Sequence, residues 1–174
     1  MVKLKRLNPN DSIKPFDCGD TDLNGFLLED DSSVSNARHH TNELLAVTYI
    51  IEDEDKEQTI AYFSLLNDKI EREITDNAAW NRLSREIPNI KRRKTQPAVK
   101  IGRLAVSKEY QGQGYATEAV KAVTEWALQK NNVTAIEAET DVNNIISQKV
   151  LAKCGFIANG VVGEEGPRFV LTRG

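Results

Sequence analysis

The chain lacks most features that mark secreted, redox-active or membrane proteins. Cys18 and Cys154 are the only cysteines among 174 residues, too few for a disulfide framework and without the C-x-x-C spacing of metal or redox sites. No stretch approaches the roughly 18 apolar residues of a membrane span. The first residues alternate charged and apolar side chains, unlike a secretion signal. We therefore expect a cytoplasmic protein that makes no membrane contact.

The chain also lacks a strong excess of charge of either sign. Lys and Arg total 23 against 26 for Asp and Glu, a net charge of -3, so any contact with nucleic acid must be local. The basic run Lys91-Arg92-Arg93-Lys94 could meet phosphates or form a solvated loop. His39 and His40 are adjacent, so on a helix they point about 100° apart and cannot form an i, i+4 metal pair. We expect no metal site.

The length of 174 residues predicts a single domain over residues 1–174. Strands are indicated by β-branched and aromatic residues, and helices by 3.6-residue spacing and capping residues. The expected strands are an edge strand over 1–7, a hairpin of 44–51 and 59–66 with a solvated tip at 52–55, a strand at 99–106, one at 134–140 and two within 156–172. The expected helices begin at Asp20 or Thr21, at Gly114 and at Asn144, with a further helix around 77–85 that should bury Trp80 and Leu83. Within 99–106, Gly102 indicates a bulge or a close backbone approach.

A small-residue loop precedes the helix that starts at Gly114. Its sequence is Gln111-Gly112-Gln113-Gly114-Tyr115-Ala116-Thr117. Glycines let several backbone N–H groups turn inward together, and the helix dipole adds partial positive charge, so a diphosphate fits there without lysines. An ordinary loop before a core helix is the alternative. A Walker loop is excluded because Gly114 is followed by Tyr115, and a dinucleotide fingerprint fits neither Thr117 nor the antiparallel strands expected upstream.

Two motifs resemble the GNAT N-acetyltransferase family. The run 111–116 matches the Q/R-x-x-G-x-G/A signature of that family, with the expected strand before it and helix after it. Asn144-Ile145-Ile146-Ser147 and Lys153-Cys154-Gly155-Phe156 resemble the family's second helix. The resemblance implies an α+β fold with a mixed, mostly antiparallel sheet of six to seven strands flanked by helices. Three segments, 16–19, 60–65 and 101–106, resemble more weakly the bacterial subgroup that contains tRNA-acetylating toxins.

The resemblance also implies acetyl-CoA as the co-substrate and a set of binding residues. Backbone groups of Leu104, Ala105 and Val106 would bind the pantetheine arm, where the strand parts from its neighbour. The amides of Gly112, Gln113, Gly114, Tyr115 and Ala116 would bind the pyrophosphate, within a loop that runs from Gln111 to Thr117. Asn144 would bind the coenzyme arm with help from Ser147. A plain helix cap at Asn144 is the alternative, compatible with that role, and Asn143 could cap instead.

The proton-transfer residues are less evident. Family members often carry a tyrosine four residues before the helix-ending glycine, where this chain has Leu151. A thiol with a pKa of about 8.5 leaves readily as the thiolate, so no acid is essential. Glu137, Glu139 and Asp141 share one face of a strand, and we predict Glu139, then Asp141, as the general base. A solvated acidic strand face is the alternative.

Three functions are compatible with these residues. The first is acetyl transfer from acetyl-CoA to a primary amine of a small molecule or protein by direct attack. The second is a toxin-like acetyltransferase of aminoacyl-tRNA, with the basic run 91–94 at the phosphates. The third is an inactive GNAT-fold module that binds acyl-CoA, motivated by Leu151. A monomer and a homodimer both remain open.

Overall fold

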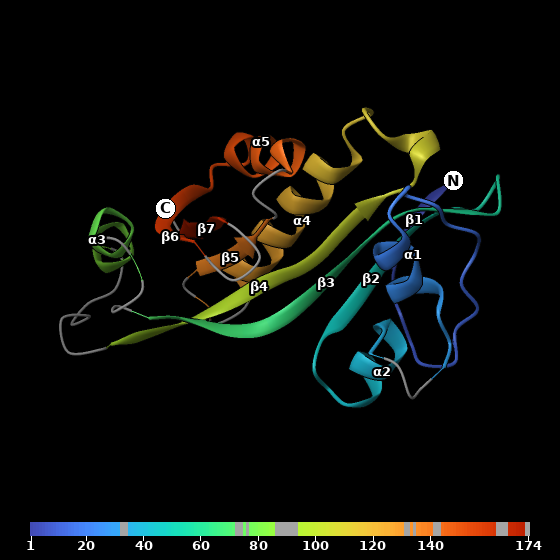
Figure 1. The fold of residues 1–174 in the computed structure, drawn as a ribbon, viewed down its shortest axis with the longest axis horizontal. Helices are drawn as coiled ribbons and strands as arrows, with labels where there is room; N and C mark the ends of the chain where they lie inside the picture. The colour runs from blue at the N-terminus through green and yellow to red at the C-terminus, as the bar shows by residue number, and fades with distance from the viewer. Residues whose placement is uncertain are drawn as a thin grey trace. The chain divides into compact units, whose positions relative to one another are not determined.

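The computed structural model describes residues 1–31, 35–71, 75, 77–85, 94–130, 133, 135–140, 144–162 and 167–172. The elements follow one another as β1 (Val2–Arg6), α1 (Thr21–Leu28), α2 (Ala37–Asn42), β2 (Val47–Asp53), β3 (Gln58–Glu71), α3 (Asn77–Arg85), β4 (Thr95–Val106), the 3-10 helix η3 (Lys108–Tyr110), α4 (Tyr115–Lys130), β5 (Ala135–Glu139), α5 (Ile145–Lys153), β6 (Ile157–Val162) and β7 (Pro167–Thr172) (Figure 1). No helix in these ranges is long and apolar enough to span a membrane.

Seven strands form a mixed sheet in the order β1-β2-β3-β4-β5-β7-β6. The pairs β1–β2, β2–β3, β5–β7 and β6–β7 are antiparallel, and β4–β5 is parallel. This confirms the α+β class, the mostly antiparallel sheet and the N-terminal edge strand. Strands β3 and β4 begin or end several residues beyond the predicted bounds, since β3 continues to Glu71 and β4 starts at Thr95.

The chain forms two compact units, each built from two segments. The first contains Met1–Leu66 and Gly102–Ala116, and the second contains Asn67–Ile101 and Thr117–Gly174. Strands β3 and β4 and helix α4 therefore each contribute residues to both units. A single domain over residues 1–174 stays a prediction.

In the first unit, α2 packs against β2 and α1 packs against α2 (Figure 1). Helix α1 begins after Asp20, whose side chain accepts from the backbone N–H groups of Asp22 and Leu23, as the capping pattern predicts. The core of this unit consists of Leu7, Phe16, Phe26, Leu27, Ala37, Ile50, Tyr62 and Ala105. Gly102 confirms the predicted close approach, because a Cβ there would collide with the Leu66 side chain and lie 3.1 Å from Ser64 Oγ.

The predicted solvated tip of the hairpin is wrong for Glu52. Glu52 lies within β2, is 4% exposed and pairs with Lys5 Nζ at 2.9 Å and Lys14 Nζ at 3.6 Å. Buried carboxylates need such partners, and these cations come from upstream segments that an acidic run does not reveal. The turn therefore begins two residues later, after Asp53.

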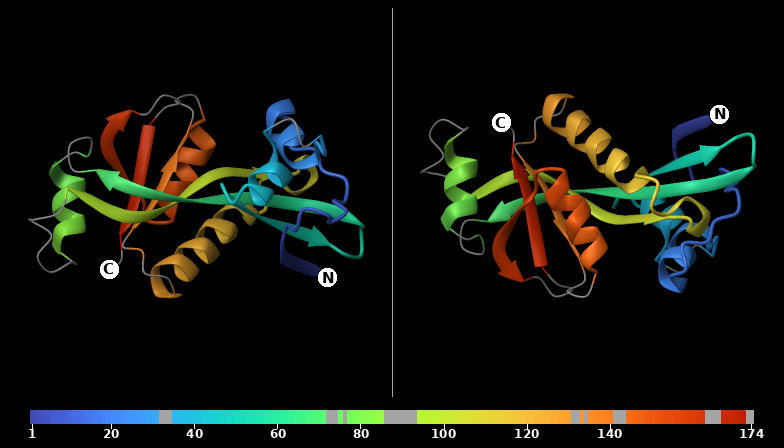
Figure 2. Two further views of the ribbon diagram at one scale, coloured as in Figure 1. Left: turned by 90° about the horizontal axis from the view of Figure 1, so that it is seen from below. Right: turned by 90° about the horizontal axis from the view of Figure 1, so that it is seen from above.

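In the second unit, α3 packs against β6 and β7 (Figure 2). Its predicted bounds are confirmed, and Trp80 is buried as expected with Ile70, Ala98, Ala135 and Val170. The predicted burial of Leu83 lies outside the described side chains. Helix α4 buries Ala119, Val120, Val123 and Ala127 along one stripe, as its 3.6-residue period requires.

Candidate functional site

The loop between η3 and α4 adopts a conformation that favours glycine. Gly112 has φ +77° and Gly114 has φ +87°, in the left-handed region that other residues rarely occupy. A Cβ at either position would meet nothing within 4 Å, so the space above both glycines is open. Tyr115 and Ala116 then begin α4, where first-turn amides have no acceptor within the helix. The loop thus offers open space and free backbone donors to an anion.

Two glutamine side chains of this loop donate hydrogen bonds to backbone carbonyl oxygens and so hold it in place. Gln111 Nε2 donates to the carbonyl oxygen of Val106 at 2.8 Å and to that of Cys18 at 3.0 Å. Gln113 Nε2 donates to the carbonyl oxygen of Glu109 at 2.9 Å. Both glutamines were predicted to belong to the binding loop, and the hydrogen bonds give them a bracing role in it.

The segment around Asp17 is a second support that sequence reasoning missed. Lys108, in η3, pairs with the Asp17 carboxylate at 3.0 Å and donates its backbone N–H to the Asp17 carbonyl at 2.8 Å. Hydrogen bonds from the Asn24 side chain, the Gly19 backbone and Lys108 lower the pKa of Asp17 to about 2. The spacing Asp17-x-Gly19 before a capped helix was the available signal, because Asp commonly accepts from the backbone two residues on.

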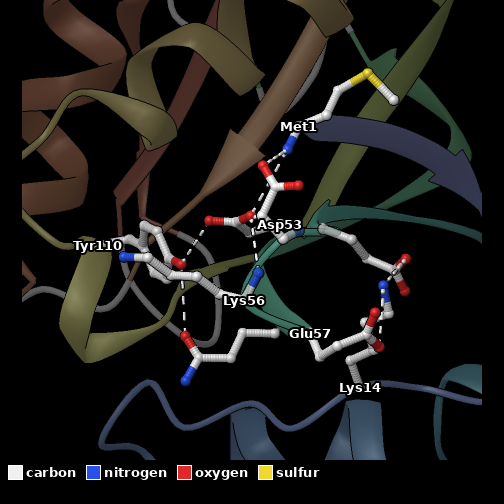
Figure 3. Close-up of polar contacts among 9 residues, drawn as sticks. Met1, Lys14, Asp53, Lys56, Glu57 and Tyr110 are labelled. Atoms are coloured by element: carbon white, nitrogen blue, oxygen red, sulfur yellow. Dashed lines mark hydrogen bonds and ion pairs between the residues drawn. The ribbon is translucent and has the colours of Figure 1, made fainter.

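The hairpin tip also contacts Tyr110, which lies in η3 directly before the glycine loop (Figure 3). Tyr110 donates its hydroxyl to Asp53 at 3.1 Å, and the Lys56 Nζ lies 5.5 Å from the Tyr110 ring centroid. The Tyr110 ring meets that of Tyr115 edge to face at 5.7 Å. Tyr110 is 6% exposed, so its ring is a fixed support directly before the glycine loop.

The end of β4 lies past its pairing with β5. The parallel register runs from Ala98↔Ala135 to Ile101↔Ala138, and residues 104–106 follow it on β4. Leu104 and Val106 are half-buried, whereas Ala105 packs into the core of the first unit. Backbone groups beyond the last β4–β5 residue pair are suited to an extended ligand, while the parting of the strands stays a prediction.

The predicted residues of the second helix lie at its start. Asn144 caps α5, since its Oδ1 accepts from the backbone N–H of Ser147 at 3.1 Å. The cap is therefore confirmed, while the proposed coenzyme contact of Asn144 and Ser147 stays a prediction, and Asn143 lies outside the described residues. Thr117 is 9% exposed and its carbonyl accepts from Cys154 Sγ at 3.8 Å, which ties α4 to α5.

The candidate general bases of β5 belong to a buried cluster of charges in the second unit. Glu139 pairs with Lys100 Nζ at 3.4 Å and with Arg168 Nε at 3.5 Å. Glu137 lies 3.7 Å from the same Arg168 nitrogen and is 3% exposed. Burial, and next the nearby Asp68 carboxylate, raise the pKa of Glu137 to about 7. Sequence periodicity found this face but does not show which cations lie next to each carboxylate.

Asp141 and Leu151 are the remaining residues relevant to proton transfer. Asp141, the second predicted base, lies outside the described residues. Leu151 is 4% exposed and packs in α5 as an apolar core residue. Among the described residues, no group of three or more His, Cys, Asp or Glu side chains could hold a metal ion.

Fold and loop together define a domain suited to an acylated coenzyme, and comparison with known proteins gives the family. A family model described as an acetyltransferase (GNAT) domain matches residues 33–157, more than half of the chain. The chain therefore belongs to the GNAT acetyltransferase family, as its two motifs predicted.

Two curated relatives carry related names. Streptothricin acetyltransferase of Escherichia coli is 26% identical over 113 residues, 65% of this chain and 56% of that protein. The uncharacterized N-acetyltransferase YjdG of Bacillus subtilis (strain 168) is 39% identical over 61 residues, 35% of this chain and 36% of that protein. The matched regions thus span about half of the first relative and about a third of the second.

Solved structures match the fold over nearly the whole chain. A mutant of KacT has a TM-score of 0.74 at 22% identity and covers 98% of this chain and 94% of its own. AtaT complexed with acetyl-methionyl-tRNAfMet has a TM-score of 0.73 at 23% identity and covers 99% and 95%. AtaTR bound with acetyl-CoA has a TM-score of 0.70 at 22% identity and covers 98% and 93%. At these identities the likeness shows the fold alone.

Proposed function

We propose that this protein transfers the acetyl group of acetyl-CoA to a primary amine. The observation that carries the proposal is the exposed loop with two left-handed glycines at the start of α4, above which a Cβ would meet no atom. Membership of the GNAT acetyltransferase family supports the same reaction. We further propose that the reaction takes place in the cytoplasm, where acetyl-CoA is available.

The residues present fit the coenzyme. The amides of 112–116 would bind its pyrophosphate, since a helix N-terminus and turned-in glycine amides favour negative charge. Backbone groups of 104–106 would bind the pantetheine arm as an added strand. The bound thioester supplies the acetyl group. The chain's own contribution is to orient the thioester and to accept the proton of the attacking amine.

Among the described carboxylates, Glu137 fits proton acceptance best. A pKa of about 7 lies near the working pH, where a general base is most effective. Glu139, the first choice from sequence, has its carboxylate engaged by Lys100 and Arg168. Because Glu137 is buried, a proton would reach it through Asp68, with which it shares a hydrogen bond. Leu151 offers no acid, and a thiolate leaves without one.

The pH dependence of acetyl transfer tests this choice. The wild type should lose kcat/KM below about pH 7, because protonated Glu137 cannot accept a proton. Glu137→Gln should lower kcat and remove the acidic limb of kcat measured at saturating amine, whereas Glu139→Gln should keep it. A limb of kcat with the wild-type midpoint in Glu137→Gln would exclude Glu137 as the base, whereas a limb of kcat/KM set by the amine's own pKa stays in every variant.

The acceptor amine has two candidate classes. A small molecule or a protein amine agrees with the named streptothricin acetyltransferase, which shares 26% identity with this chain. Aminoacyl-tRNA is the second candidate, favoured by the fold match to AtaT in its acetyl-methionyl-tRNA complex over 99% of the chain. Of the basic run, Lys94 is exposed, whereas Lys91, Arg92 and Arg93 lie outside the described residues. Growth arrest on expression, relieved by a loop mutation, would favour the tRNA acceptor, and normal growth would argue against it.

Coenzyme binding is the first experiment. Isothermal titration with acetyl-CoA should give saturable binding that Gly114→Glu weakens about 100-fold, since a carboxylate replaces open space at the pyrophosphate. Gly25→Glu is the control for the added charge, because it adds the same carboxylate at an exposed helical glycine whose Cβ also meets no atom, and Gly114→Ala is the control for the side chain at φ +87°. No binding of acetyl-CoA at millimolar concentration would remove the enzyme hypothesis.

Acetylation of an amine panel separates the enzyme from the inactive binding module. The enzyme should produce acetylated amine that disappears in Gly114→Glu. Binding of acetyl-CoA without product from any amine would favour the module.

A further inference from the structure

Arg103 projects from β4 into the aromatic side of the first unit. Successive strand residues alternate between faces, so Arg103 shares the face of Ala105, which packs with Phe26 and Tyr62 in the core. The Arg103 Cζ lies 3.9 Å from the centroid of the Phe26 ring. A guanidinium at this distance forms a cation–π contact that holds the side chain in place.

Arg103 has no anionic partner within the part of the chain that the structure describes. No carboxylate there lies within ion-pair distance of its guanidinium, and its recorded side-chain contact is the Phe26 ring. The other half-buried arginines differ. Arg168 pairs with Glu137 and Glu139, and Arg38 donates to the carbonyl oxygens of Pro9 and Asp11 at 2.5 and 2.6 Å. A half-buried guanidinium without such partners has donors left to satisfy.

Stacking on an aromatic ring leaves these donors accessible. The guanidinium is planar and carries five N–H donors around its edge, so its face can cover a ring while its edge binds a carboxylate or a phosphate. Such pairs are commonly bidentate, with two parallel N–H···O bonds. Phe26 itself is 5% exposed, which gives the stacked group a rigid base.

His40 and Ser35 extend this polar surface. The His40 ring meets the Phe26 ring edge to face at 5.3 Å, and Ser35 Oγ lies 2.8 Å from His40 Nε2. His40 Nδ1 is buried and has no hydrogen-bond partner among the described residues. Burial, and next the charge of Arg103, lower the pKa of His40, so this ring is neutral near pH 7 and Arg103 is the local cation.

We infer that Arg103, stacked on Phe26 beside His40, binds an oxyanion, a carboxylate or a phosphate. Arg103 directly precedes 104–106, the stretch proposed for the pantetheine arm, and consecutive Cα atoms lie about 3.8 Å apart. The anion would therefore belong to the acceptor and help to fix its amine near the thioester. This role rests on the proposed function, whereas the anion site itself does not.

A titration without turnover tests the site. The Nε–Hε NMR signal of Arg103, identified by its loss in Arg103→Lys, is followed while inorganic phosphate is added at constant ionic strength. The signal should shift saturably at millimolar phosphate, while that of the exposed Arg6 should not. Acetate in place of phosphate gives the second arm, and the anion that saturates at the lower concentration identifies the preferred group. If neither anion shifts the Arg103 signal more than that of Arg6, the inference is overturned.

A variant that still covers the Phe26 ring but lacks the guanidinium separates anion binding from packing. Arg103→Met preserves an apolar stem on the ring but has no charge. Phosphate should raise the Tm of the wild type and of Arg6→Gln, but not that of Arg103→Met. In turnover, the preference for an amino acid over its carboxamide should fall about 10-fold in Arg103→Met if the bound group is a carboxylate. Equal stabilisation of the wild type and Arg103→Met by phosphate would assign Arg103 to packing alone.

Discussion

The glycine loop of the first unit exposes polar backbone groups, whereas the charge cluster of the second unit buries charged side chains. The loop is exposed and offers backbone donors, with Gly112 and Gly114 supplying the conformation. The cluster is mostly buried and consists of side chains, with Glu137 and Glu139 next to Lys100 and Arg168. The loop's properties therefore depend on residue type at each position, whereas those of the cluster depend on which strands meet.

The strongest test of this contrast is a pair of substitutions in the cluster. The raised pKa of Glu137 means that this carboxylate binds its proton more tightly in the folded state than in the unfolded state, where its pKa is near 4.5. The stability that this group contributes is thus present below about pH 4.5 and is lost as the pH rises through about 7. Glu137→Gln should be more stable than the wild type at pH 8, by up to about 3 kcal/mol, and equal to it near pH 4.

Glu139→Gln should have the opposite sign at pH 8. It removes a carboxylate that Lys100 and Arg168 share, and these side chains are only 27% and 25% exposed. Breaking a buried ion pair leaves cations uncompensated, so the variant should be destabilised. Urea unfolding of both variants at the two pH values measures the difference. Equal effects at pH 8 would mean that the two carboxylates have the same environment.

The second test separates two roles of the loop glycines, which are to adopt a left-handed backbone conformation and to leave open space for the coenzyme. Gly112→Ala and Gly155→Ala introduce the same methyl group at φ +77° and φ +92°, so each should cost about 1–2 kcal/mol of stability. Only Gly112→Ala should also weaken acetyl-CoA binding, about 10-fold, because its methyl group occupies the space above the loop. Calorimetric titration of both variants decides this. A similar loss of affinity in Gly155→Ala would attribute the effect to backbone strain.

The same contrast explains what the sequence could predict. The order of the expected strands and helices and the cap at Asn144 follow from local residue types, and these predictions are confirmed, whereas helix α2 was not predicted. The partners of Glu52 and the environment of Glu137 depend on residues distant in the sequence, such as Lys5 and Asp68. Periodicity places a carboxylate on a face but does not say which cations reach it. The tip of the hairpin was therefore misjudged at Glu52, while the choice of Glu139 as the general base stays a prediction.

The smallest expected effect concerns the Gln111 hydrogen bonds that hold the glycine loop in place. Gln111→Leu removes the hydrogen bonds to the carbonyls of Val106 and Cys18, each worth about 1 kcal/mol or less at an exposed site. The loop should then be less well ordered before the coenzyme binds, so part of the binding free energy is spent on ordering it.

This effect should appear in one kinetic constant. The KM for acetyl-CoA should rise about threefold in Gln111→Leu with kcat unchanged, since a brace affects binding of the ground state and transition state alike. Gln113→Leu, which loses the single bond to the Glu109 carbonyl, should show a smaller rise. Steady-state kinetics at varied acetyl-CoA measure both. A fall in kcat for Gln111→Leu would show instead that the loop's position matters to the reacting groups themselves.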